Sequence, residues 1–261
     1  MSPAQPPAQR KSAQHKTALV TGVGRLAGIG AGIARRLAAD GWDLVLTYWQ
    51  DYDARMPWGV QPDDVERLTL ELQATGAAVV ALPADFENPT AVDRLMAAAA
   101  EKAGTLQALV LSHTESVDSG ILDTSLGSFE RHFAVNTRAS WQLIAAFARQ
   151  APAEGGAIVA LTSDHTAFNV PYGASKGALD RIVFAAAREL GPLGISANAL
   201  NPGPVDTGWM DRQLREDLAR RQPGGRLGTP SDVAGTVAFL LSPAGRWVSG
   251  QLVKADGGFS A

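Results

Sequence analysis

The chain is 261 residues long, with 46% hydrophobic and 19% charged residues, a formal net charge of -3 and a pI of about 5.8. This length suits one large α/β domain or two small ones, and the weakly acidic balance argues against nucleic acid or an anionic membrane as the main partner. The sequence contains no cysteine, which excludes disulfides, thiol catalysis and cysteine-ligated metals, and its four histidines show none of the short spacings of metal ligands. We therefore expect no metal site.

The first 15 residues are rich in Pro, Ala, Gln and Ser and lack the apolar core of a signal peptide. We expect a flexible tail over residues 1–15, followed by a single catalytic domain over residues 16–261. No stretch reaches the roughly 18 uninterrupted apolar residues of a membrane span. The prediction is a soluble, cytoplasmic protein.

Short apolar runs alternate with longer segments of helical period, as in repeated βαβ units around a parallel sheet. The predicted strands cover residues 17–20, 44–47, 79–82, 106–111, 157–161, 195–200 and, at an edge of the sheet, 251–255. The predicted helices cover residues 29–39, 63–75, 89–103, 126–150 (one or two helices), 172–190 and 231–241. This pattern predicts one doubly wound (Rossmann) α/β domain, with a seven-stranded, mostly parallel sheet flanked by helices.

Two connections are unusual in length or composition. Residues 48–62 form an aromatic and acidic segment, longer than the usual few residues between a strand and a helix, and we expect a loop. Residues 205–225 are polar and suit a mobile lid. Both segments are candidates for setting substrate specificity.

The turn TGVGRLAGIG, residues 21–30, connects the first predicted strand to the first helix. Glycines let a backbone approach phosphates closely, and a helix N-terminus offers unpaired N–H donors and a favourable dipole. A glycine-rich turn by itself is often only a tight connection. Its position after the first strand favours a pyrophosphate site.

Tyr172 and Lys176 are four residues apart, so a helix beginning near Pro171 would present both on one face. A free tyrosine has a pKa of about 10, and an ammonium one turn away is expected to lower the pKa of Tyr172 toward the working range of an acid/base catalyst. Ser163 follows the apolar run 157–161 and could hydrogen-bond a reacting oxygen. The alternative is a buried structural tyrosine beside a solvated lysine.

These motifs, in this order, resemble those of the short-chain dehydrogenase/reductase family over about residues 16–259. The glycine turn is similar to the family's Thr-Gly-x-x-x-Gly-x-Gly with two extra residues. The other matching positions are Asp85 after the third strand, Asn136, Ser163, Tyr172 and Lys176 as a tetrad, Asn198, Pro202 and Gly203 around the sixth strand, Thr207, and the C-terminal segments 225–234 and 256–258.

The resemblance implies an NAD(P)(H)-dependent oxidoreductase that transfers a hydride between nicotinamide and a carbonyl or secondary alcohol, most like the 3-oxoacyl-thioester (acyl-carrier-protein) reductases. In the implied catalytic set, Tyr172 moves the proton, Ser163 holds the oxygen, and Asn136 helps to hold a water that relays protons to Lys176. The implied cofactor-binding residues are Gly22, Arg25, Gly28, Ile29, Gly30, Asp85 (to the adenine), Phe86, Tyr172, Lys176 (to the ribose), Pro202, Gly203, Val205 and Thr207. The resemblance also implies a homodimer or homotetramer packed through segments 126–150 and 172–190.

The sequence departs from the family pattern at two places near the site. Leu111, Ser112, His113 and Thr114 stand where the family has Asn-Asn-Ala-Gly, and His113 is expected to be a hydrogen-bonded structural substitute, or else to contact substrate or cofactor. Ser163 precedes Tyr172 by about four fewer residues than is common in the family. Asp164 and His165 in this short connection are expected to make loop hydrogen bonds, with an extra acid/base pair as the alternative.

The choice of dinucleotide depends on the end of the second strand, where NAD enzymes carry an acidic residue for the adenosine 2′-hydroxyl. Residues 47–49 contain no acid, and Arg25 in the enlarged glycine turn could meet a 2′-phosphate. This mildly favours NADP(H) over NAD(H), although a solvent-facing arginine is nearly as good a reading of Arg25. The rival to an enzyme is a dinucleotide-binding regulatory or scaffold protein that has lost turnover.

Overall fold

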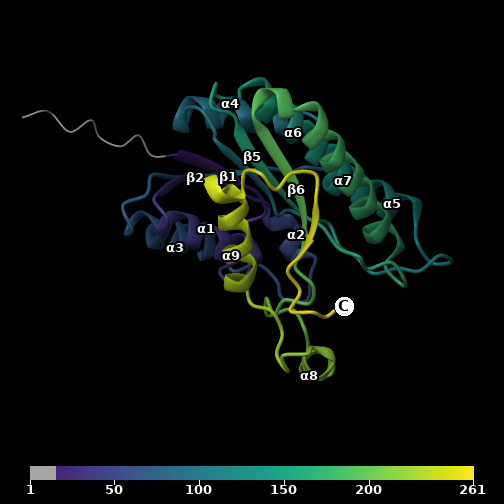
Figure 1. Ribbon diagram of the computed structural model, residues 1–261. Coiled ribbons are helices and arrows are strands. Elements are labelled where there is room, and N and C mark those ends of the chain that lie inside the picture. Colours follow the sequence, from purple (N-terminus) through teal and green to yellow (C-terminus); the bar gives the residue numbers. More distant parts are fainter. Residues whose placement is uncertain (1–15) are drawn as a thin grey trace, which may run out of the picture.

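A seven-stranded parallel sheet forms the centre of the computed structural model, which describes residues 16–261 (Figure 1). The predicted tail 1–15 lies outside the described residues. The strand order is β3-β2-β1-β4-β5-β6-β7, every adjacent pair is parallel, and β7 lies at an edge as predicted. The strands are β1 Lys16–Val20, β2 Trp42–Tyr48, β3 Val79–Pro83, β4 Ala108–Leu111, β5 Gly156–Leu161, β6 Ile195–Asn201 and β7 Leu252–Lys254.

Helices cover both faces of this sheet, so the inner strands are buried on two sides and read as continuous apolar runs. Along β1, Ala18 and Val20 face one apolar core and Leu19 faces the other, as the two-residue period of a strand requires. The first core lies under α1 Ile29–Ala39, α3 Asp64–Gln73 and α9 Pro230–Leu241; the second lies under α4 Ala91–Ala103, α6 Ala139–Arg149 and α7 Val170–Glu189. The predicted single-domain Rossmann fold is confirmed.

The predicted helical segment 126–150 consists of three consecutive pieces. It begins with α5 Leu126–His132, continues through a π-helical turn at Phe133–Arg138, and ends with α6. Short 3₁₀ turns at Gly191–Leu193 and Pro243–Gly245 complete the elements. Within residues 16–261, no helix combines the length and apolarity that a membrane crossing requires.

Two segments that were predicted without regular structure contain helices. The connection 48–62 holds the short helix α2 Gln50–Ala54, and the proposed lid 205–225 holds the ten-residue helix α8 Arg212–Arg221. Figure 1 shows α8 standing away from the sheet. The Asp211 side chain caps α8 by accepting a 2.7 Å hydrogen bond from the backbone N–H of Leu214. No residue of α8 is buried, so this helix does not contribute to either core.

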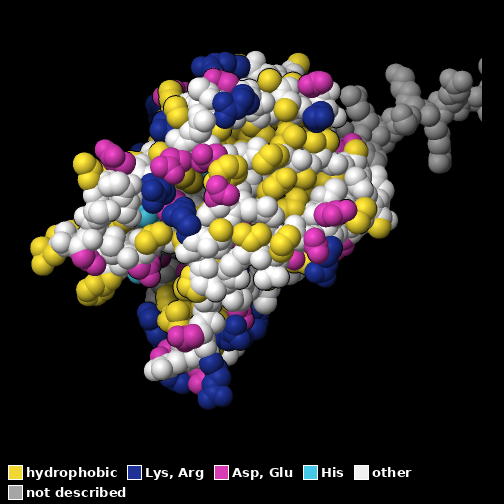
Figure 2. Space-filling model, turned by 180° about the vertical axis from the view of Figure 1, so that it is seen from behind, with side chains coloured by type: hydrophobic (Ala, Val, Ile, Leu, Met, Phe, Trp, Pro, Cys, Tyr) yellow, Lys and Arg dark blue, Asp and Glu magenta, His cyan; other side chains and the backbone are white. Residues whose placement is uncertain are grey.

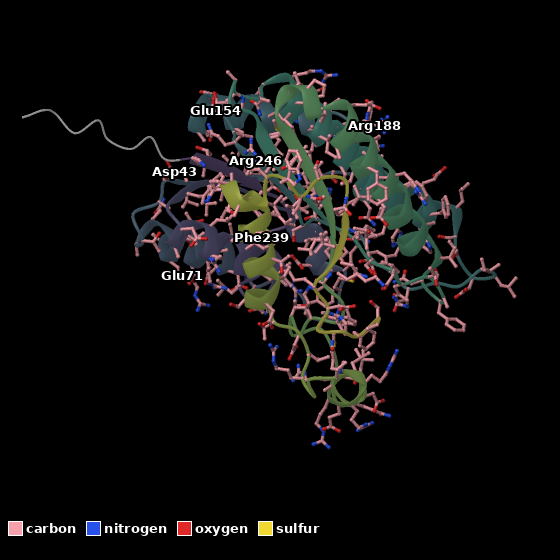
Figure 3. All side chains as sticks on the ribbon, viewed as in Figure 1. Asp43, Glu71, Glu154, Arg188, Phe239 and Arg246 are labelled. Atoms are coloured by element: carbon pink, nitrogen blue, oxygen red, sulfur yellow. The ribbon has the colours of Figure 1, made fainter. Side chains whose placement is uncertain are left out.

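The amino ends of the parallel strands lie together at one end of the sheet. The connections there pack closely. Arg246 donates hydrogen bonds of 3.1 Å to the backbone carbonyl oxygens of Glu154 and Gly194, which precede β5 and β6 (Figure 3). A Cβ on Gly155 would lie only 2.1 Å from the Gly194 oxygen. The backbones before β5 and β6 are therefore in close contact at the amino ends of the strands. We expect the functional site at the carboxyl ends.

Candidate active site

The glycine turn connects β1 to α1 and leaves the N-terminus of α1 without a side-chain cap. Gly28 is the N-cap residue, and the first turn from Ile29 contains no acidic residue. Gly22 has φ +73°, and a Cβ there would lie 2.6 Å from the Cα of His113; a Cβ on Gly30 would lie 2.8 Å from the Gly22 oxygen. Glycine is required at both positions. The uncapped N–H groups and the bare backbone fit the phosphates of a dinucleotide.

Arg25, in the two-residue extension of this turn, is already engaged. Its Nε lies 3.7 Å from an Asp53 carboxylate oxygen, and its guanidinium stacks 4.5 Å from the ring centroid of Trp58. Its Nη1 donates a 3.3 Å hydrogen bond to the backbone carbonyl of Thr207. In this structure the charge that was expected to meet a 2′-phosphate is therefore paired within the protein.

His113 is buried and hydrogen-bonded on both sides of its ring. Its Nδ1 lies 2.7 Å from the Thr21 hydroxyl, and its Nε2 lies 3.1 Å from the Val135 carbonyl oxygen. The Phe86 ring lies against it, with centroids 4.4 Å apart. Burial, aided by the nearby Lys176 charge, lowers the pKa of His113 to about 3, so the imidazole is neutral. This geometry agrees with the expected structural substitute.

Asn136 lies in the π-helical turn and is completely buried. Its Oδ1 accepts hydrogen bonds from the Glu115 N–H at 2.7 Å and the Thr114 hydroxyl at 3.2 Å. Its Nδ2 donates to the Glu115 carbonyl and to Ser175 Oγ, both at 2.9 Å. These four bonds use the full capacity of the amide. A water held by Asn136 would have to use its backbone atoms, and that role stays a prediction.

Tyr172 and Lys176 lie on the first turns of α7, one turn apart, with the Lys176 Nζ 5.7 Å from the centroid of the Tyr172 ring. Lys176 is buried, not solvated, and its Nζ donates a 2.9 Å hydrogen bond to the Leu161 carbonyl at the end of β5. Ser163 follows two residues later, and it lies near enough to Tyr172 to lower the pKa of that phenol. The helix and the strand end thus bring the three predicted side chains together.

The expected lowering of the Tyr172 pKa by Lys176 is wrong for this structure. Burial raises the pKa of Tyr172 to about 12; the neighbouring Ser163 hydroxyl lowers it in part, and the charge of Asp118 raises it further. Burial likewise lowers the pKa of Lys176 to about 8, against the opposing charge of Asp180. For both groups the removal of a charge from water is the largest cause of the shift in pKa.

The remaining cofactor-binding predictions lie at the carboxyl edge of the sheet. Asp85 follows β3, and its carboxylate accepts a 2.9 Å hydrogen bond from the Glu87 N–H. Gly203 has φ +61°, and a Cβ there would lie 2.5 Å from the Cβ of Asp256. Val205 is buried and forms a β-bridge with Gly228. Pro202 and Thr207 flank these positions.

Three other polar residues singled out in the sequence make contacts that support loops and backbone. Asn198 is within β6, and its amide donates a 2.7 Å hydrogen bond to the Val248 carbonyl, so it supports the backbone before β7. Asp164 is exposed and lies 3.8 Å from Lys254. His165 is exposed, and its N–H donates a 3.2 Å hydrogen bond to the Ser163 hydroxyl. The loop role expected for Asp164 and His165 agrees with these contacts.

An ion pair that the sequence did not predict joins the segment after β2 to the segment after β4. Arg55 donates to both carboxylate oxygens of Glu115, at 3.1 and 2.8 Å, and the Glu115 side chain is only 3% exposed. Nearby, the Tyr52 hydroxyl donates a 3.4 Å hydrogen bond to the Ser116 carbonyl. The length and aromatic content of residues 48–62 marked the segment, but no sequence pattern indicates its partner.

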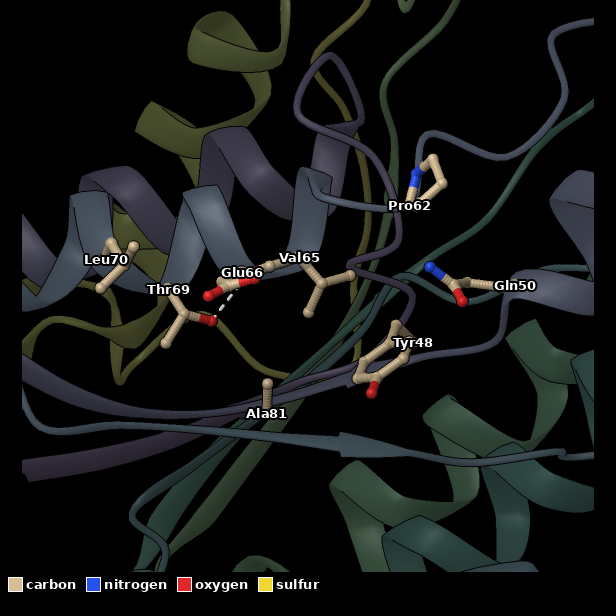
Figure 4. Close-up of a pocket in the computed structure, with 8 residues that line it drawn as sticks. All are labelled: Tyr48, Gln50, Pro62, Val65, Glu66, Thr69, Leu70 and Ala81. Carbon is tan, nitrogen blue, oxygen red and sulfur yellow. Dashed lines mark hydrogen bonds between the residues drawn. The ribbon is translucent and has the colours of Figure 1, made fainter.

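A cavity of about 310 Å³ opens beside the end of β2, between α3 and β3 (Figure 4). None of the residues that line it is basic, and Glu66 is the only charged one. The lining residues are Tyr48, Gln50, Pro62, Val65, Glu66, Thr69, Leu70 and Ala81. This cavity therefore offers no cation to a 2′-phosphate.

The arrangement of a glycine turn, a buried Tyr–Lys pair and a parallel sheet has counterparts among known proteins. A family model described as "Enoyl-(Acyl carrier protein) reductase" matches residues 22–260. The chain belongs to the short-chain dehydrogenase/reductase family. As a member of this family it is an NAD(P)-dependent oxidoreductase, as the sequence predicted.

Relatives of this short-chain dehydrogenase/reductase match along most of its length. The versicolorin reductase stcU of Emericella nidulans is 36% identical, with 93% of this chain and 95% of that protein covered. A blue fluorescent protein from a metagenomic library, solved in complex with NADPH, is 34% identical with a TM-score of 0.85, covering 94% and 98% of the two chains. A short-chain dehydrogenase from Burkholderia cenocepacia, solved with NADP, is 33% identical with a TM-score of 0.84 and the same coverage.

Proposed function

We propose that the protein transfers a hydride between a nicotinamide cofactor and a carbonyl or secondary alcohol, with Tyr172 as the general acid/base. The observation that carries this proposal is the convergence of Ser163, Tyr172 and Lys176, with Ser163 near Tyr172, the Lys176 Nζ 5.7 Å from the centroid of the Tyr172 ring, and Lys176 anchored to Leu161. These are the groups needed to hold an oxygen and to move its proton.

In the proposed reaction the hydride chemistry is supplied by the bound nicotinamide. The Ser163 hydroxyl holds the carbonyl oxygen, and the Tyr172 hydroxyl donates a proton to that oxygen as it gains charge. A Tyr172 pKa of about 12 keeps the phenol protonated, which is the form that ketone reduction requires. The Lys176 ammonium stabilises the phenolate that remains and binds the ribose hydroxyls, and Asn136 joins the segment after β4 to α7.

For the cofactor we propose NADP(H) in preference to NAD(H). Support comes from relatives solved with NADPH or NADP and from the absence of an acid at the end of β2, Thr47 to Trp49. Fluorescence titration with both reduced dinucleotides tests this preference. The groups proposed to bind the cofactor are the backbone of Gly22, Gly28, Ile29 and Gly30, together with Arg25, Asp85, Phe86, Tyr172, Lys176, Pro202, Gly203, Val205 and Thr207.

For the substrate we propose a ketone with a large apolar body. Exposed apolar side chains occur on three segments that follow strands β4, β5 and β6, namely Val117, Phe168 and Trp209. One relative is named for the reduction of versicolorin, and the sequence resemblance favours 3-oxoacyl thioesters. A panel should therefore contain a 3-oxoacyl thioester, a fused aromatic ketone and a small polar ketone.

The test is the change in absorbance near 340 nm when the protein is mixed with each dinucleotide and this panel. Wild type is expected to turn over at least one ketone, whereas Tyr172→Phe should bind the dinucleotide as tightly and lose at least about 100-fold in kcat. Normal turnover by Tyr172→Phe would overturn the assignment. Dinucleotide binding without turnover across the panel would favour the rival, a regulatory or scaffold protein of the same fold.

We also propose that the protein is a homo-oligomer that packs through α5, α6 and α7. Phe129, Phe133, Trp141 and Ile182 line an open groove of about 500 Å³ on this surface, and Trp141 is 55% exposed. Hydrophobic side chains also gather across the middle of the face shown in Figure 2, with charged side chains around them. Apolar surface of this kind is typical of interfaces between subunits, in a dimer or a tetramer.

A further inference from the structure

The segment between β2 and α3, residues 49–62, crosses the carboxyl edge of the sheet; it is called the strap below. It begins where β2 ends, yet its polar contacts are with the segments that follow β1 and β4. The strand order reverses between β1 and β4, so these two neighbours form the switch point of the sheet. A doubly wound fold binds its ligand in the crevice at that point. The strap therefore lies at the switch point, and Figure 1 shows its helix α2 near the carboxyl ends of the strands.

One end of the strap brings a carboxylate against the glycine turn. A Cβ on Gly24 would lie 2.9 Å from the Asp53 Oδ2, which places the carboxylate in direct contact with the turn. The Asp53 Oδ1 accepts a 2.8 Å hydrogen bond from Trp58 Nε1 and lies 3.7 Å from Arg25 Nε. The carboxylate is thus an anion beside a guanidinium and a bare glycine backbone. A phosphate would use the same partners.

Burial of Asp53 is unfavourable by itself. The Asp53 side chain is 10% exposed, and burial raises its pKa, while the Trp58 hydrogen bond and the Arg25 charge act in the opposite direction. A buried carboxylate needs such partners. Its position at the turn is therefore specifically held.

The other end of the strap is fastened to the catalytic side of the crevice. Arg55 forms the two-bonded ion pair with Glu115, whose backbone is held by Asn136. Tyr52 adds the hydrogen bond to the Ser116 carbonyl. The Arg55–Glu115 pair, called the clamp below, closes the strap over the space between the glycine turn and the proposed catalytic residues.

We propose that the strap occupies the cofactor crevice in the cofactor-free protein, with Asp53 standing in for a cofactor phosphate, so that strap and dinucleotide exclude one another. The inference rests on the proposed dinucleotide-binding function. Cofactor binding then requires the clamp to open and Asp53 to leave Arg25, which frees that guanidinium for a phosphate. The measured affinity is reduced by the fraction of molecules whose strap is closed.

The experiment measures binding of NADPH and of NADH without substrate, by stopped-flow nicotinamide fluorescence, so that no turnover is needed. Arg55→Gln opens the clamp and Asp53→Asn removes the competing charge. Asp51→Asn, an exposed residue of the same short helix, is the matched control for loss of a negative charge. Arg55→Gln removes a positive charge, so electrostatics alone predict slower and weaker binding of an anionic cofactor.

We expect Arg55→Gln and Asp53→Asn to raise the association rate constant and lower Kd about tenfold, with Asp51→Asn within about twofold of wild type. Faster dissociation and weaker binding by Arg55→Gln would mean that the strap closes over bound cofactor, and would overturn the inference while leaving the proposed function intact. Unchanged constants in both variants would overturn it in the same way. Binding by Arg55→Gln but not by wild type would support it, and no binding by any of the proteins would overturn both proposals.

Discussion

Asp180 follows Lys176 by one turn of α7, and its charge raises the pKa of the buried ammonium against the effect of burial. Tyr172, Lys176 and Asp180 are thus spaced four residues apart along one side of the helix, with the proposed acid/base at one end and a carboxylate at the other. Burial raises the pKa of Asp180 as well, and the nearby Thr162 and the Lys176 charge oppose that change. We interpret Asp180 as a positioning residue that acts through Lys176.

Asp180→Asn should move the basic limb of the pH profile to lower pH. Lys176 has a pKa of about 8 in the free protein, and loss of the neighbouring charge lowers it further. The kcat/KM for ketone reduction should therefore fall at a lower pH in the variant, by on the order of one pH unit, with dinucleotide Kd unchanged at pH 6. Asp164→Asn makes the same change from carboxylate to carboxamide at an exposed position. It should leave the midpoint of the pH profile unchanged. Identical midpoints in wild type and Asp180→Asn would contradict the positioning role.

His113 should make the protein sensitive to acid. Its folded pKa is about 3 and its unfolded value about 6.5, so below pH 6.5 the unfolded chain binds a proton that the folded protein excludes. The free energy of unfolding should drop by up to about 1.4 kcal/mol per pH unit between pH 6.5 and 3. In urea titrations at pH 7 and pH 5, wild type should lose roughly 2 kcal/mol more than His113→Asn. His132 also has a lowered pKa and affects both proteins equally.

Gly22 and Gly41 form a matched pair for testing the close approach at the glycine turn. Both have positive φ, but a Cβ on Gly41 meets nothing within 4 Å, whereas one on Gly22 meets the His113 backbone at 2.6 Å. Gly41→Ala should lower the free energy of unfolding by about 1–2 kcal/mol, from backbone strain alone. Gly22→Ala should lower it by about 4 kcal/mol or more and weaken dinucleotide binding. If chemical denaturation gave the same loss of stability for Gly22→Ala and Gly41→Ala, the close contact between Gly22 and the His113 backbone would not be needed for stability.

Trp141→Glu should break the proposed subunit interface. A carboxylate in the groove between α5, α6 and α7 would lose its contact with water in the assembly, beside the apolar side chains of Phe129, Phe133 and Ile182. Sedimentation velocity should show a smaller species than wild type at the same concentration. Leu70→Glu, at a 59% exposed position on α3, should leave the sedimentation coefficient unchanged. An unaltered mass for Trp141→Glu would exclude this surface as the interface.

The parts of the fold that depend on local pattern were predictable. Continuous apolar runs such as β5 and β6 indicated strands covered on both faces, and the glycine turn lay where the first strand meets the first helix. The spacing of Tyr172 and Lys176 placed both on one helix face. Each of these predictions needs only the geometry of a single element or its immediate neighbour.

The parts that depend on tertiary burial were not predictable. The Tyr172 pKa was expected to fall, but it rises. The direction of the shift depends on how far the fold removes the phenol from water. For Arg25 the sequence offered a cofactor 2′-phosphate or solvent as its surroundings, but not Asp53, which reaches it through a connection whose path no periodicity describes. The ring of His113 contacts the Thr21 hydroxyl across 92 positions of sequence. Contacts between residues so far apart in sequence can be predicted only when the strand order is known.

The amino ends and the carboxyl ends of the parallel strands differ in how much the connecting segments can vary. At the amino edge, Arg246, Glu154 and the paired glycines Gly155 and Gly194 leave little freedom for insertion. At the carboxyl edge, segments 49–62 and 163–169 and the α8 region can change in length without entering either core. Exchange of these segments among relatives is therefore a route to new substrate selectivity on an unchanged scaffold, and the strap is the first segment to exchange.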